Sequence, residues 1–196
     1  MRILLAGILG GIAMFVWNFI GHDVLPLGHT GIHELPNEAA VLDALKTNMG
    51  ENHGLYHFPG FGLGDNPTRE QKQEAMKHVN EKLAANPSGI LIYHPPGRQF
   101  AFVRALVVEF ATDVLQSILV VFLLAQTSLA TFGSRVGFVF VAGVLATITT
   151  NISYWNWYGF PKRYTAAYMF IELVGFICVG IVAALILRKN TSRTAP

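Results

Sequence analysis

The chain has 196 residues, of which 52% are hydrophobic and only 13% are charged, with a formal net charge of +2. Soluble domains carry about 25% charged residues, so this composition excludes an ordinary soluble domain and favours a membrane protein. The small positive charge gives no basis for nucleic-acid binding. The single cysteine, Cys178, excludes an intrachain disulfide and a thiolate metal site.

The first predicted element is a membrane helix within residues 1–22. Ile3–Ile20 contains eighteen residues without a charge, enough for about 27 Å of helix at 1.5 Å per residue. The positive region before it is only Met1–Arg2 and no small-residue cleavage site follows, which favours an uncleaved anchor over a signal peptide. Gly7 and Gly11 form a GxxxG step, which permits a close helix contact or reflects only how common glycine is in membrane helices.

Residues 23–98 form the one long hydrophilic stretch and hold nine of the twelve acidic residues. Asn37 is a good helix N-cap and Gly50 a good helix stop. Thr68 begins a second helix, with Gln71 completing a capping box.

A β-prone run follows each of these two helices, and both runs contain the pattern Tyr-His-x-Pro-Gly, at Tyr56–Gly60 and Tyr93–Gly97. Two helix-strand units can pair their strands into one small sheet. We therefore expect a small αβαβ module, too small for a large core of its own.

Three more apolar segments follow within residues 99–188, and a short tail closes the chain at residues 189–196. The segments are Phe100–Ala125, Val136–Tyr154 and Ala167–Leu187. The aromatic connection Trp155–Tyr164 is typical of a membrane interface. The predicted fold class is mainly α and integral to the membrane: a four-transmembrane-helix bundle with the αβαβ insertion between helices 1 and 2.

The short loops predict the orientation of the four spans. The side that carries both termini and the 126–135 turn holds five basic residues, whereas the loop between the last two spans holds only Lys162 and Arg163. The positive-inside rule then puts both termini in the cytoplasm and residues 23–98 outside it.

The histidines offer one candidate site. His29 and His33 are four residues apart, as are His53 and His57. On a helix this spacing can chelate copper or zinc. The surrounding glycines and prolines argue against helix at both pairs, so no cofactor is predicted and copper or zinc remains an alternative.

Polar residues inside the apolar segments offer a second candidate site. Glu109, Asp113 and Gln116 share one stripe of the second helix, and each of the other helices brings a polar group toward the same end. Such residues are costly in hydrocarbon and normally face a bundle interior or a cavity. The predicted cluster contains Asn18, His22, Arg104, Glu109, Asp113, Gln116, Asn151 and Glu172. It fits a structural ion-pair network, a docking socket or a proton or ion site. The second span can also shift inward and leave Glu109 in the headgroups.

The exit from the first helix, with Trp17, His22 and Leu25-Pro-Leu-Gly28, together with the two Tyr-His-x-Pro-Gly motifs, resembles a family of bacterial four-helix membrane proteins with an extracytoplasmic insertion. That family has no assigned activity, so the resemblance implies the architecture and a bacterial inner membrane as the location, and nothing about activity.

No nucleophile motif, phosphate loop or dinucleotide fingerprint occurs in the sequence. We therefore expect a non-enzymatic accessory, scaffold or assembly subunit of a larger membrane complex. Its partners would be the lipid bilayer and other membrane subunits, or a second copy of the chain. The alternatives are an extracytoplasmic copper- or zinc-binding protein, a small proton- or ion-coupled carrier, and an enzyme that uses His22 and the membrane acids as acid and base.

Overall fold

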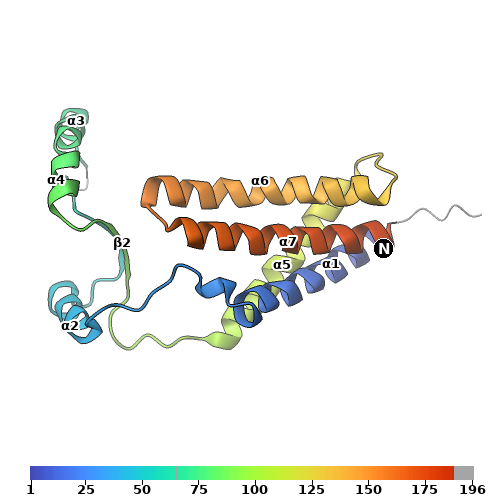
Figure 1. The fold of residues 1–196 in the computed structure, drawn as a ribbon, viewed down its shortest axis with the longest axis horizontal. Coiled ribbons are helices and arrows are strands. Elements are labelled where there is room, and N and C mark those ends of the chain that lie inside the picture. Colours follow the sequence, from blue (N-terminus) through green and yellow to red (C-terminus); the bar gives the residue numbers. More distant parts are fainter. Residues whose placement is uncertain (65, 188–196) are drawn as a thin grey trace, which may run out of the picture. The chain divides into compact units, whose positions relative to one another are not determined.

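The computed structural model describes residues 1–64 and 66–187, and the predicted tail 189–196 lies outside the described residues. Four helices are long and apolar enough to cross a membrane (Figure 1). They are α1 (Arg2–Phe19) with its π-helical extension η1 (Ile20–Val24), α5 (Phe102–Ala125), α6 (Phe132–Tyr158) and α7 (Lys162–Ile186). These four helices confirm the predicted mainly helical fold class. Their length and apolar composition are those of an integral membrane protein.

The third and fourth apolar helices are longer than their hydropathy predicts, and local capping explains the difference. The Thr131 side chain accepts a hydrogen bond from the Ser134 backbone nitrogen at 3.1 Å, so α6 begins at Phe132. Gly159 has a φ of 71° and ends α6, and α7 then begins directly after Pro161. Most of the predicted aromatic connection Trp155–Tyr164 is therefore helical.

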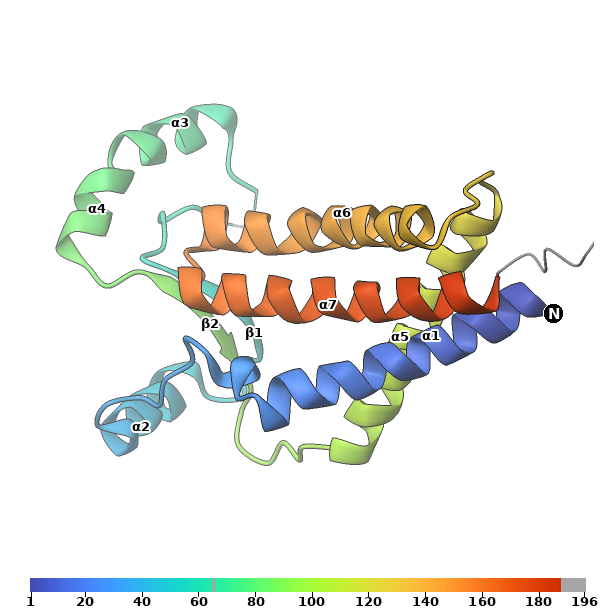
Figure 2. The same ribbon diagram turned by 45° about the vertical axis from the view of Figure 1, so that its right-hand side comes forward.

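The chain forms two units, one of which is the insertion Glu34–Phe100. Its elements are α2 (Glu38–Met49), β1 (Gly54–Phe58), α3 (Arg69–Lys77), α4 (Val79–Ala85) and β2 (Gly89–Tyr93). The two strands pair antiparallel with Tyr56 opposite Leu91, which confirms the predicted small sheet. Figure 2 shows the two strands side by side.

The helix ends of the insertion follow the sequence signals in part. The predicted capping box is present, because the Thr68 hydroxyl accepts from the Gln71 backbone and the Gln71 side chain accepts from the Thr68 backbone. Asn37 does stand at the start of α2, but its side chain makes no capping hydrogen bond. The second predicted helix is broken at His78 into α3 and α4.

The other unit contains Met1–His33 and the three remaining long helices, and its two inner helices are α1 and α7. Helix α1 packs against both α5 and α7, and α7 also packs along α6 (Figures 1 and 2). Contacts of α5 with α6 and α7 are far fewer, so α5 is flanked on one side only.

Glycines of α1 make its close contact with α5 possible. A Cβ atom at Gly7 would lie 2.7 Å from the Ile118 side chain, and one at Gly11 would overlap the Cα atom of Val114. Between apolar helices in lipid, association depends on van der Waals packing, which small residues improve by letting backbones approach. The GxxxG step is therefore a helix contact in this fold.

We expect substitution of Gly11 by alanine to destabilise the helical unit. The added methyl group must push α5 away from α1, and such overpacking typically costs about 1–3 kcal/mol. Thermal unfolding in mild detergent, followed by circular dichroism, measures the effect. Gly137→Ala is the matched control, since a Cβ at Gly137 of α6 meets nothing within 4 Å. Equal melting temperatures for the two variants would contradict the close α1–α5 contact.

Candidate functional site

The best-defined polar contact between long helices joins α1 to α5. The Asn18 side-chain nitrogen donates to both carboxylate oxygens of Asp113, at 3.3 Å to Oδ1 and 3.1 Å to Oδ2. Asn18 is 5% exposed and Asp113 is 1% exposed. An amide thus binds a carboxyl group inside the packed helices, within the apolar segments of both.

Helix periodicity places these two side chains in the interface. Asn18 lies seven residues after Gly11 on the α1 face that approaches α5, and Asp113 lies one turn before Ser117 on the facing side of α5. Ser117 contacts the same surface, since a Cβ at Gly10 would meet its hydroxyl oxygen. The close approach that the glycines permit is what brings the amide to the carboxyl.

Helix α7 adds polar groups at the same level. The Trp17 indole nitrogen donates to the Ile171 carbonyl oxygen at 2.8 Å. Glu172, the next residue, is half-buried and close enough to interact electrostatically with both Asp113 and His22. The cluster is therefore formed by three helices, α1, α5 and α7.

His22 lies at the end of α1 in a defined position. Its Nδ1 atom is 2.9 Å from the Asn18 carbonyl oxygen, and its ring meets Tyr168 edge-on with 5.6 Å between ring centres. A Cβ at Gly28 would lie 2.6 Å from the His22 ring, so only glycine allows the 3-10 turn η2 (Leu27–His29) to fold back against it. The histidine is thereby held beside the cluster.

Two buried oxygen atoms of the cluster lack a hydrogen-bond partner among the described residues. They are Oδ1 of Asn18 and Oγ of Ser117. Buried polar atoms are almost always paired, and an exception calls for an explanation such as a bound species that completes the pairing.

The remaining members of the predicted cluster are placed differently. Arg104 and Glu109 are exposed on α5, and Arg104 forms no salt bridge within residues 1–64 and 66–187. Gln116 is half-buried. Asn151 donates to Thr147 of its own helix at 2.9 Å, so it does not reach the other helices through this bond. Glu109 still lies within electrostatic range of Asp113, one turn away.

Neither histidine pair lies on an α-helix. His29 ends η2 and His33 follows in irregular structure, while His53 precedes β1 and His57 lies within it. The i, i+4 argument for chelation therefore does not apply to either pair. Within the described part of the chain, no three His, Cys, Asp or Glu side chains are grouped to hold a metal ion.

Three contributors to the site were not predicted from the sequence: Trp17, Ser117 and Tyr168. Ser117 had a detectable signal, because it lies four residues after Asp113 and so shares its helix face. Trp17 and Tyr168 had none, since an aromatic residue near a membrane interface is expected without any specific contact.

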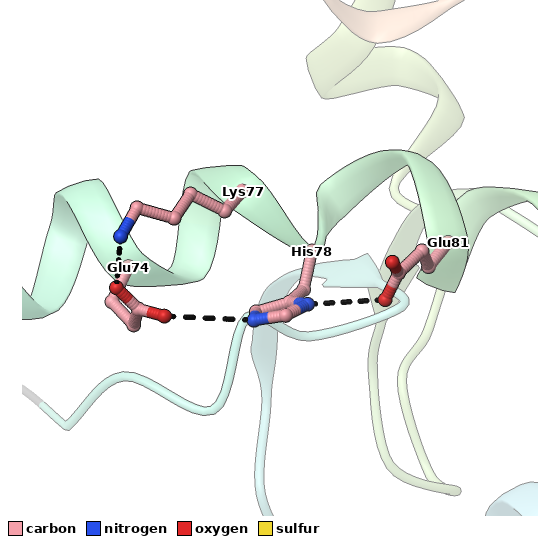
Figure 3. Close-up of polar contacts among 4 residues, drawn as sticks. All are labelled: Glu74, Lys77, His78 and Glu81. Atoms are coloured by element: carbon pink, nitrogen blue, oxygen red, sulfur yellow. Dashed lines mark hydrogen bonds and ion pairs between the residues drawn. The ribbon is translucent and has the colours of Figure 1, made fainter.

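A second, exposed polar group occupies the break between α3 and α4 in the insertion (Figure 3). His78 lies between two glutamates, with its Nδ1 atom 3.0 Å from Glu81 and its Nε2 atom 3.6 Å from Glu74. Glu81, and more weakly Glu74, raise the pKa of His78 above its usual 6.5. Lys77, through its hydrogen bond and its charge, lowers the pKa of Glu74 below 4.5.

No family model matches the chain, and no curated protein or solved structure shows significant similarity to it.

We expect the raised pKa of His78 to fall toward 6.5 in Glu81→Gln, because the largest stabilising contact of the imidazolium is removed. Since folding raises this pKa, the ion pairs stabilise the α3–α4 break fully below about pH 6.5 and lose that contribution as the pH rises through the folded value. NMR titration of the full chain in detergent, with the signal assigned by His78→Gln, measures the pKa. Glu51→Gln, another exposed carboxylate of the insertion, is the control, and an equal change in both variants would contradict the assignment.

Proposed function

We propose that this protein is a non-enzymatic accessory subunit of a larger complex in a bacterial inner membrane, and that it binds a partner subunit through the open side of α5. The observation that carries the proposal is the exposure of the first half of α5. Every residue from Val103 to Thr112 is exposed. Phe110 meets Phe15 of α1 edge-on, with 5.3 Å between ring centres, and is still 40% exposed.

The composition of this segment does not suit lipid alone. Val103 is 73% exposed and Val107 is 60% exposed, so part of the segment is strongly apolar. Arg104 and Glu109 are exposed on the same segment. If the segment lies in hydrocarbon, each charge costs roughly 2.5–3.5 kcal/mol at mid-bilayer on insertion scales. If it lies outside, its apolar side chains face water.

The Asn18–Asp113 contact limits how far α5 can slide to resolve this mismatch. Because Asp113 is bonded to α1 near the end of an apolar run, Glu109 lies about one turn, or 5.4 Å, further out. Shifting α5 inward would break a buried hydrogen bond to a carboxyl group. A partner membrane helix resolves the mismatch by covering the valines and offering Glu109 a basic or hydrogen-bond-donating side chain.

We expect a photo-crosslinking residue at Val107 to join this protein to a different, discrete membrane protein in native membranes. The control position is Val141 of α6, which is 57% exposed and so similar to Val107 at 60%. Glu109→Gln should reduce the Val107 crosslink roughly tenfold, because a hydrogen bond to a charged group contributes about 1.5–3 kcal/mol.

Three outcomes would contradict the accessory-subunit proposal. They are a crosslink at twice the mass of the chain, which means a second copy; equal capture from Val107 and Val141; and lipid adducts alone.

The proposal includes the orientation that the basic residues favour, with the termini in the cytoplasm and the insertion outside it. We expect Glu51→Cys in the insertion to react with a membrane-impermeant maleimide in intact cells, and Ser128→Cys in the α5–α6 turn to react only after permeabilisation. Both sites are exposed. Cys178, which is half-buried, is replaced by serine in both proteins. The reverse labelling pattern would overturn the orientation.

A further inference from the structure

We propose that Asp113 and Asn18 form a proton-binding site, in which the protonated carboxyl group of Asp113 donates its hydrogen to the unpaired Oδ1 atom of Asn18. The two side chains then make a cyclic acid–amide pair that joins α5 to α1. The proton comes from a hydronium ion in water, whose O–H bond breaks as the O–H bond of the carboxyl group forms, and on release it returns to water by the reverse step. This site is separate from the docking face and does not depend on it.

Asp113 is buried without a counter-charge among the described residues. Asp113 is 1% exposed, and its bonded partner is a neutral amide. All salt bridges within the described chain lie in the insertion, among Glu74, Lys77, His78 and Glu81. A buried ionised carboxylate without a cation is strongly unfavourable, and taking up a proton is the usual way in which the cost is avoided.

The groups that face Asp113 do not supply a compensating charge. Helix α7 contributes Glu172 and α5 itself contributes Glu109, both of them acidic, and Tyr168 of α7 interacts with these two glutamates rather than with Asp113. The His22 ring of α1 is bonded to a backbone carbonyl and interacts with Glu172. Arg135, the buried cation of α6, donates to Leu129 at the opposite end of the helices. Several carboxylates in one site cannot all be ionised at low cost.

An unpaired acceptor beside Asp113 supports a protonated carboxyl group independently of the charge. Asn18 is 5% exposed, and its Oδ1 atom has no donor among the described residues, although its amide group is directed at the carboxyl group through Nδ2. An ionised Asp113 can only accept hydrogen bonds, so it leaves Oδ1 unpaired. A protonated Asp113 carries the one missing donor. The same proton therefore removes a buried charge and satisfies a buried acceptor.

The site links proton binding to helix packing. Loss of the proton would leave a charge at the narrowest contact of α1 with α5, where the glycines exclude any larger group. It would also place the charge of Asp113 one turn away from the carboxyl group of Glu109 on α5. Uptake of the proton thus favours the packed arrangement, and its release favours separation of α1 from α5.

Infrared spectroscopy of the purified full chain in lipid nanodiscs tests the proposal at neutral pH. We expect the carbonyl stretching band of a protonated carboxyl group in the wild-type protein. Labelling with ¹³C-aspartate should shift this band, which assigns it to aspartic acid without any substitution. Asp113→Asn should abolish it, and circular dichroism checks that this neutral, isosteric variant is folded. Glu172→Gln and Glu109→Gln are the matched controls and should keep the aspartic acid band.

Asn18→Leu tests the pairing itself. We expect the band to remain but to move to higher frequency, because the carbonyl oxygen loses the hydrogen bond from the amide. The proposal is overturned if the labelled protein shows no aspartic acid band, or if the band survives in Asp113→Asn. It is also overturned if the band is absent with sodium present and appears only when sodium is removed, because a metal cation then occupies the site.

Discussion

The helical unit depends on the close approach of α1 to α5. No side chain larger than hydrogen fits on α1 at Gly7 or Gly11. Asn18 and Asp113 meet where this close contact ends. In lipid there is little hydrophobic gain from joining two apolar helices, so the energy comes from close packing and from polar groups that find each other. The glycines permit the close packing, and they bring the polar side chains of Asn18 and Asp113 together. A carboxyl group on α5 alone would be energetically costly in the apolar segment. Beside the amide of Asn18 it forms a specific contact that sets the register of the two helices.

Helix α1 lies between α5 and α7, and its contact with α5 fixes one side of this arrangement. Its second face receives α7 through the bond from Trp17 to Ile171 and through Gly21, where a Cβ would lie 3.1 Å from Ile171. Because α1 fills the space between them, α5 and α7 meet only slightly, and α5 keeps an open side. The two proposals use different faces of the same helix. The inner face of α5 carries the proton site, and the outer face of its first half carries the partner contact.

Local signals in the sequence predicted much of the fold. The four spans follow from hydropathy, and the capping box at Thr68 and the paired strands of the insertion follow from short motifs. The lengths of α6 and α7 were underestimated. Capping at Thr131, Gly159 and Pro161 extends these helices through polar and aromatic residues that hydropathy alone assigns to a loop. The break at His78 was missed as well. There the flanking glutamates bind the imidazole at the point where one helix stops and the next begins, and no spacing rule distinguishes this from a continuous helix.

The sequence by itself determined the class of protein and the list of polar residues that the membrane segments must accommodate, because both depend on composition and on distances along one helix. Only the tertiary structure decided which of those residues meet. Asn18, Asp113, Glu172 and His22 gather, whereas Asn151 bonds within its own helix and Arg104 stays on the surface. The reason is geometric, because the packing of neighbouring helices decides which face of a helix is turned inward. Here the close contact at the glycines of α1 decides which face of α5 is buried. The unpaired oxygen of Asn18, which carries the proton proposal, exists only in that packed arrangement.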